Sequence, residues 1–153
     1  MSQLSWGKPD METAPSIDGA AAADAEWQAI DTPKQGTTKL TTTAGTETEA
    51  SEEGGELVDW RKEKNKYQLE FDLFVKKGGK RPWEDTDGVI EGEHSIRLTP
   101  EDPACEGILI DRCTVSVEHS YTTADGILLH YVAKALKPKT GKMVKPYVKQ
   151  ASA

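Results

Sequence analysis

A stretch of alternating apolar and polar residues near the middle of the chain most constrains the fold. Every second position is apolar, and the residues between are polar apart from Phe74: Tyr67, Leu69, Phe71, Leu73 and Val75 alternate with Gln68, Glu70 and Asp72. Successive side chains of a β-strand point to opposite faces. This period therefore predicts a half-buried strand with one face on a core and the other in water.

An acidic segment separates this strand from an earlier one. Residues 37–43 are rich in β-branched side chains and predict a strand. Residues 45–55 contain no apolar side chain larger than that of Ala50, so they can bury little surface on their own. We expect a long acidic loop that is mobile in an isolated monomer and becomes ordered against a partner.

Three further strands are predicted later in the chain. Residues 89–98 form one, with a bulge at Gly92, and residues 108–121 form a long one whose apolar phase shifts near residues 111–113, which indicates a second bulge. Residues 127–136 are apolar on both sides and predict a central or covered strand. A turn with Gly126 in the left-handed conformation joins the last two strands. The predicted register pairs Tyr121 with Leu129 and directs His119 and His130 to opposite faces.

The predicted fold class is all-β, with a β-sandwich or barrel-like core of about six strands and one short helix. The helix candidates are residues 20–28, with Asp18 as the N-cap, and a single turn that begins at Thr99. We expect an extended N-terminal arm over residues 1–36, a β domain over 37–137 and a basic C-terminal tail over 138–153. Pro138 and Pro146 argue against sheet in that tail. Trp6 and Trp27 are large anchors in the arm, and they can dock on the same chain or on a neighbour.

The net charge of −7 is distributed unevenly along the chain. Residues 1–59 carry three basic and twelve acidic side chains, whereas residues 126–153 carry six lysines and no acid. Either both ends are simply solvated, or complementary ends meet between copies of the protein. Six lysines without an arginine are a poor nucleic-acid footprint.

No pattern of catalytic or metal-binding residues is evident, and we expect neither an enzyme nor a cofactor. His94, His119 and His130 do not have the spacing of a metal site, and no phosphate-binding glycine motif occurs. Cys105 and Cys113 are expected to be free, partly buried thiols. No run approaches the roughly 20 apolar residues that span a bilayer, and no secretory signal is visible. We therefore expect synthesis in the cytoplasm and no membrane partner.

Three segments together resemble the tail tube (major tail) proteins of tailed bacteriophages. They are TTKL at residues 37–40, the acidic run EASEEGGELVD at 49–59 and the strand at 67–75, and a final hairpin at 121–136 with its polar tail adds to the likeness. The resemblance covers roughly residues 30–138.

That resemblance implies a virion protein, made in the cytoplasm of a bacterial host, that forms stacked rings. The rings are expected to be hexameric, to contact other tail proteins and to pass DNA through the lumen without binding it specifically. The candidate inter-subunit residues lie in the acidic loop, the arm and the tail: Glu47, Glu49, Glu52, Glu53, Glu56, Trp6, Trp27, Lys142 and Lys145.

Two other functions remain open from the sequence. One is a different virion component, such as a capsid decoration protein or a tail terminator. The other is a monomeric β-sandwich that binds carbohydrate or peptide through exposed aromatic side chains, for which Trp60 and Trp83 are the candidates.

Overall fold

The part of this protein that the structure describes is built from β-strands. The computed structural model describes residues 3–21 and 26–148, and no helix occurs within them. The strands are β1 (Asp10–Ile17), β2 (Ala20–Ala21), β3 (Gln28–Ile30), β4 (Lys39–Thr43), β5 (Glu47–Ser51), β6 (Leu57–Lys62), β7 (Lys66–Phe74), β8 (His94–Thr99), β9 (Gly107–Thr122), β10 (Gly126–Ala135) and β11 (Lys145–Tyr147). The all-β class is confirmed, but the predictions of about six strands and one short helix are wrong.

Turn chemistry explains why the expected helices do not form. Asp18 and Gly19 both have positive φ, 54° and 90°, and they make the tight turn between β1 and β2 in place of a helix N-cap. The remainder of the expected helix at 20–28 includes residues 22–25, which lie outside the described residues. Thr99 ends β8, opposite Asp10 of β1, and the residues that follow it form turns.

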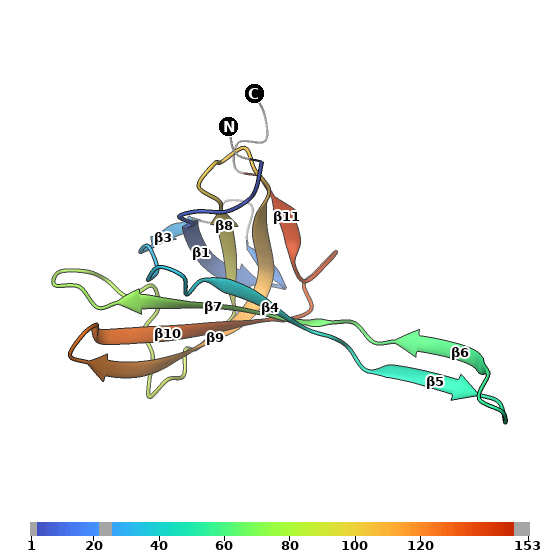
Figure 1. The fold of residues 1–153 in the computed structure, drawn as a ribbon. Helices are drawn as coiled ribbons and strands as arrows, with labels where there is room; N and C mark the ends of the chain where they lie inside the picture. The colour runs from blue at the N-terminus through green and yellow to red at the C-terminus, as the bar shows by residue number, and fades with distance from the viewer. Residues whose placement is uncertain (1–2, 22–25, 149–153) are drawn as a thin grey trace.

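The main sheet is antiparallel and curled into a half-barrel. Its strand order is β2-β1-β8-β9-β10-β7-β4, with β3 paired to β1 and β11 paired to β9. In Figure 1, β1, β8 and β11 stand at a steep angle to β7 and β10. The long strand β9 belongs to both parts, because its first residues pair with β8 and β11 and its later residues pair with β10.

A bulge in β9 marks the change of direction. His94 pairs with Cys113 and Ile96 pairs with Ile110, so β9 has one residue more than β8 between these pairs. The predicted bulge near residues 111–113 is therefore confirmed. The hydroxyls of Ser16 and Ser95 donate hydrogen bonds to the carbonyl of Asp111, at 2.9 and 2.5 Å. The bulge expected at Gly92 is wrong, since β8 begins only at His94 and Gly92 lies in the preceding loop.

The core lies on the odd-numbered face of β7, β9 and β10, as the alternation in residues 67–75 predicts. Phe71 and Tyr131 are fully buried and stack with ring centroids 5.4 Å apart. Trp83, from the connection between β7 and β8, packs against both rings at 6.4 and 5.5 Å. The same face includes Leu69, Leu73, Val115, Val117, Leu129 and Ala133, all buried.

The β9–β10 hairpin corrects one predicted register. Gly126 has the expected positive φ of 71°, but Tyr121 pairs with Ile127 and His119 with Leu129, two residues away from the predicted partners. A shift of two positions keeps every side chain on its face. His119 and His130 therefore point to opposite faces as predicted. The expectation that the last long strand is central is confirmed, since β10 lies between β9 and β7.

Both terminal segments contribute to the sheet. In the expected arm, β1 pairs with β8 from Asp10 to Pro15, and Met11 is only 1% exposed. Arg97 of β8 makes an ion pair with Glu12 at 3.0 Å and lies 4.1 Å from the ring centre of Trp27. The expectation that Pro146 excludes sheet from the tail is wrong, because Pro146 lies within the short strand β11 opposite Ile108.

Replacement of Phe71 by alanine should destabilise the fold strongly. The change opens a cavity between Tyr131 and Trp83 and should lower the free energy of unfolding by about 3–5 kcal/mol. Phe74→Ala is the matched control on the other face of β7, where the ring is only half-buried, and it should have a much smaller effect. Urea denaturation of both variants measures the difference, and equal losses would contradict this location of the core.

Candidate functional site

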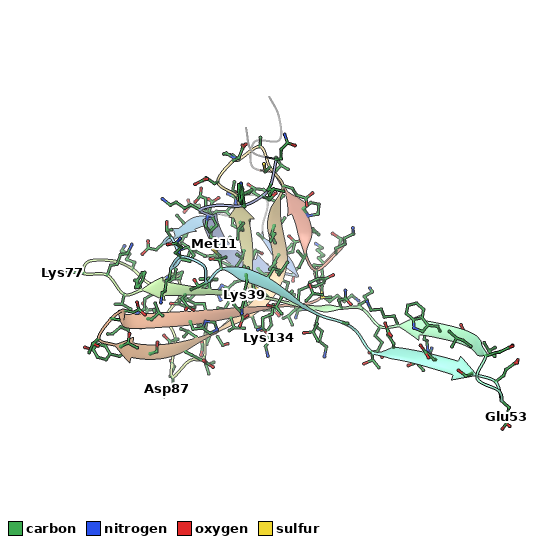
Figure 2. The ribbon with its side chains drawn as sticks, viewed as in Figure 1. Met11, Lys39, Glu53, Lys77, Asp87 and Lys134 are labelled. Atoms are coloured by element: carbon green, nitrogen blue, oxygen red, sulfur yellow. The ribbon has the colours of Figure 1, made fainter. Side chains whose placement is uncertain are left out.

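A β-hairpin formed by β5 and β6 projects from the sheet. It is inserted between β4 and β7, and Figures 1 and 2 show it extending well beyond the rest of the molecule, with Glu53 at its tip. All residues of both strands are exposed. A two-stranded hairpin without a packed face is only marginally stable in water. This segment is therefore the candidate functional site.

Backbone pairing gives the hairpin its regular shape. Glu47 pairs with Lys62 and Glu49 with Trp60, and the register shifts between Ala50 and Ser51. Gly54 and Gly55 at the tip have φ of 97° and 93°, which glycine adopts without strain. The segment expected to be a long acidic loop is therefore a β-hairpin. The strands form through backbone hydrogen bonds even though their side chains bury almost nothing.

A narrow neck joins the hairpin to the sheet. A Cβ atom at Gly45 would lie 2.0 Å from the carbonyl oxygen of Glu63, so the backbones of the two strands are in close contact there. The amide of Gly45 donates to the side-chain oxygen of Asn65 at 3.2 Å, and the amide of Glu63 donates to the carbonyl of Thr46 at 2.9 Å. Only glycine fits this crossing.

The hairpin surface combines exposed apolar side chains with acids. Leu57, Val58 and Trp60 are 54%, 60% and 48% exposed. The predicted inter-subunit acids all belong to this hairpin or its tip: Glu47, Glu49, Glu52, Glu53 and Glu56, with Asp59 beside them. The structure thus adds an apolar component to a site that the sequence identified only by its charge.

The end of the main sheet that lies farthest from the hairpin has a basic and apolar surface. Residues 76–81 follow β7 and include Lys76, Lys77, Lys80 and Arg81, all exposed and with no acid among them. Val75 directly precedes this loop, Ile127 lies opposite Val75, and Tyr121 lies opposite Ile127. The three side chains are 40%, 45% and 71% exposed, respectively. We call these residues together the basic end. The basic end was not predicted from the sequence, although four cations within six residues were a visible signal.

The other predicted inter-subunit residues lie elsewhere. Trp6 is 66% exposed and lines a hollow of about 700 Å³ between the N-terminal segment and the β3–β4 connection. Trp27 packs on Arg97, and Lys145 makes an ion pair with Asp111, so both are engaged within the chain. Lys142 is exposed near the base of the hairpin. The structure does not bring these four residues to the hairpin tip.

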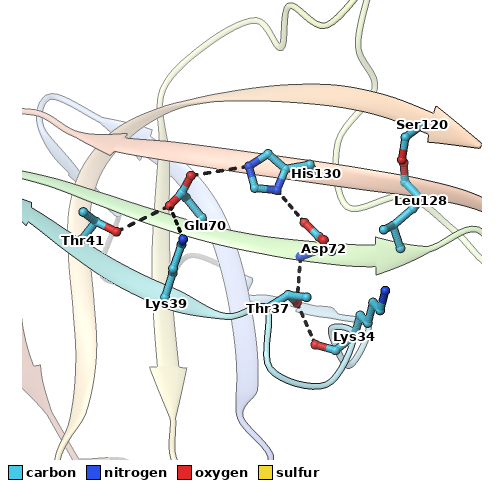
Figure 3. A network of polar contacts seen from close by, with 9 residues as sticks. All are labelled: Lys34, Thr37, Lys39, Thr41, Glu70, Asp72, Ser120, Leu128 and His130. Atoms are coloured by element: carbon cyan, nitrogen blue, oxygen red, sulfur yellow. Dashed lines mark hydrogen bonds and ion pairs between the residues drawn. The ribbon is translucent and has the colours of Figure 1, made fainter. Parts of the chain in front are cut away.

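A polar network covers the even-numbered face of β7 and β10 (Figure 3). The imidazole of His130 contacts Asp72 through Nδ1 at 2.5 Å and Glu70 through Nε2 at 3.5 Å. Glu70 also interacts with Lys39 at 3.7 Å and with the hydroxyl of Thr41 at 3.5 Å. The hydrogen bond to Asp72 raises the pKa of His130 above its usual 6.5, and the nearby carboxylates of Glu70 and Glu118 raise it further against the opposing effect of burial.

The two cysteines are further reactive groups of the described residues. They form no disulfide, as predicted; Cys105 is partly buried and Cys113 is fully buried. Burial raises the pKa of Cys113 to about 12, so its thiol stays protonated and is a poor nucleophile. No group of three or more His, Cys, Asp or Glu side chains that could hold a metal ion occurs in residues 3–21 and 26–148. The hollow beside Trp6 has no His, Cys, Asp or Glu in its lining.

Comparison of the chain with protein-family models and with curated proteins finds no match. Across the described ranges, the structure contains no helix long and apolar enough to cross a membrane. Function is therefore inferred from the sequence pattern and from the surfaces of the fold.

The pKa of His130 should lie above 6.5 in an NMR titration and should fall in the variant Asp72→Asn. Because the folded state raises this pKa, the stabilisation by protonated His130 is complete below its usual pKa and is lost as pH rises through the folded value. The loss of stability in His130→Gln should therefore be larger at about pH 6 than at about pH 9. A wild-type pKa at or below 6.5 would contradict this geometry.

Proposed function

We propose that this protein is a structural subunit that assembles with copies of itself into stacked rings, the tail tube of a tailed bacteriophage. The observation that carries the proposal is the projecting hairpin, whose strands are exposed along their whole length. Burial of apolar surface contributes about 25 cal/mol per Å². The exposed Leu57, Val58 and Trp60 therefore gain most when the hairpin docks on another surface.

The edge of the sheet supports assembly around a ring. β4 is the last strand on its side of the sheet within the described residues, and four of its five residues are exposed. An uncovered edge strand favours pairing with another chain. In a ring, each such edge is closed by the neighbouring subunit, and the open half-barrel becomes part of a continuous wall.

The acidic character of the chain fits a conduit for DNA. With a net charge of −7, a lumen lined by this protein repels phosphate and lets DNA pass without being retained. Under this proposal the partners are other copies, further tail proteins and the passing DNA. The site of action is the virion tail, and six subunits form each ring.

The structure weakens the alternative of a monomeric binding module. Trp83, one of its two candidate aromatics, is 7% exposed and packs in the core against Phe71 and Tyr131. Trp60 lies on the hairpin among acids and other apolar side chains. A different virion component, such as a decoration protein or a tail terminator, would form trimers or single rings rather than tubes.

Removal of the hairpin should abolish stacking while the sheet stays folded. Fusion of Gly45 directly to Lys64 leaves a four-residue connection between the paired residues Thr43 and Lys66, a length that hairpins accept readily. Wild-type protein should form rings or tubes by light scattering and negative-stain imaging, whereas this deletion should not form tubes.

Ile17→Ser is the matched control, since it removes an apolar side chain that is 62% exposed but lies outside the hairpin. This variant should assemble like the wild type. Circular dichroism establishes that each variant keeps its β-structure. A wild-type chain that stays monomeric at its highest soluble concentration, or a deletion that still forms tubes, would contradict the proposal.

A further inference from the structure

We infer that the acidic hairpin of one copy docks on the basic end of the next copy. This inference rests on the proposed self-assembly and adds the surface that receives the hairpin: the loop at residues 76–81 with the apolar side chains of Val75, Tyr121 and Ile127. The two surfaces match in charge, in apolar content and in their positions on the molecule.

The charges of the two surfaces are opposite in sign, although Arg81 of the basic end also pairs with Asp85 at 3.9 Å. Residues 46–62 carry six acids and two basic side chains, a net charge of −4. Residues 76–81 carry four basic side chains and no acid, a net charge of +4. Opposite potentials of this kind guide two surfaces together and set their register, and they oppose the pairing of like surfaces.

The apolar parts of the basic end form one continuous row. Tyr121 pairs with Ile127 across the β9–β10 hairpin, and the amide of Val75 donates to the carbonyl of Ile127 at 3.2 Å. All three side chains occupy odd positions, so they extend the core face past its buried part. This row can receive Leu57, Val58 and Trp60 of a hairpin while the surrounding lysines face its acids.

The two surfaces lie at opposite ends of the molecule. β7 begins just after the hairpin and ends at the basic loop, and Figure 2 shows Glu53 and Lys77 far apart at the two extremes. The hairpin therefore cannot reach the basic end of its own chain. A contact between two different surfaces on identical subunits is head-to-tail, and it repeats to give a ring or a stack.

Several other cations are less suited to receive the hairpin, because they already make ion pairs. Lys34 makes an ion pair with Asp125 at 3.0 Å, Lys39 interacts with Glu70, and Lys145 with Asp111. By contrast, Lys76, Lys77 and Lys80 make no ion pair within the part of the chain that the structure describes. Their charges are thus available to a second copy.

Charge reversal on each surface tests the contact. One variant carries Glu52→Lys, Glu53→Lys and Glu56→Lys, and the other carries Lys76→Glu, Lys77→Glu and Lys80→Glu. Each variant alone places like charges on both surfaces and should lose tubes in negative-stain images and in sedimentation. An equimolar mixture restores opposite charges at every contact and should form tubes in which the two variants alternate.

A variant at three other exposed lysines is the matched control for the loop variant. Lys134→Glu, Lys137→Glu and Lys139→Glu changes the net charge by the same amount but leaves the basic end intact, and it should assemble like the wild type. Tubes formed by the loop variant alone, or a mixture that fails to assemble, would overturn this inference. In both cases, tubes formed by the wild type would leave the proposed function standing. A wild type that never assembles would overturn both.

Discussion

The architecture depends on a single strand, β9, that belongs to both parts of the curled sheet. Its first residues pair with β8 and its later residues with β10, and the extra residue near Asp111 makes the change of direction. A bulge interrupts the ladder and strengthens the local twist. The hydroxyls of Ser16 and Ser95 satisfy the carbonyl of Asp111 at this point, so two other strands hold the bend in place. The steep angle between the two parts of the sheet, and hence the half-barrel, follows from this bulge.

The sequence predicted those features that depend on local alternation. The buried face of β7, the bulge in β9 and the central place of β10 all follow from which positions are apolar. The exact partners in the β9–β10 hairpin could not be obtained this way, because a shift of two residues leaves every side chain on the same face. The helix expected to begin near Asp18 does not start there, because an Asp-Gly turn brings β2 back against β1. The β5–β6 hairpin was missed because its pairing is carried by the backbone and needs no apolar alternation.

The candidate interaction surfaces were likewise predicted in part. The acids of the hairpin were visible as a charged run, whereas the exposed Leu57, Val58 and Trp60 became part of the same surface only once β6 was placed. At the other end, Val75 adjoins the basic loop in sequence, but Tyr121 and Ile127 come from a later part of the chain. Only the pairing of β7 with β10, and of β10 with β9, brings these residues together. A surface assembled from distant segments cannot be found from composition alone.

The close contact between the backbones of Gly45 and Glu63 divides the chain into two parts with different constraints. Residues of the sheet are constrained by folding, and residues of the hairpin are constrained, in the proposed assembly, by contacts with other molecules. Within the described residues, β5 and β6 contact each other and no other strand, so we expect substitutions along them to leave the packing of Phe71, Tyr131 and Trp83 undisturbed. The hairpin can therefore change in length and sequence without loss of folding, and the effect of such changes is felt only between molecules. Gly45 is the exception, since any side chain there meets the backbone of Glu63. Folding itself therefore requires glycine at this position.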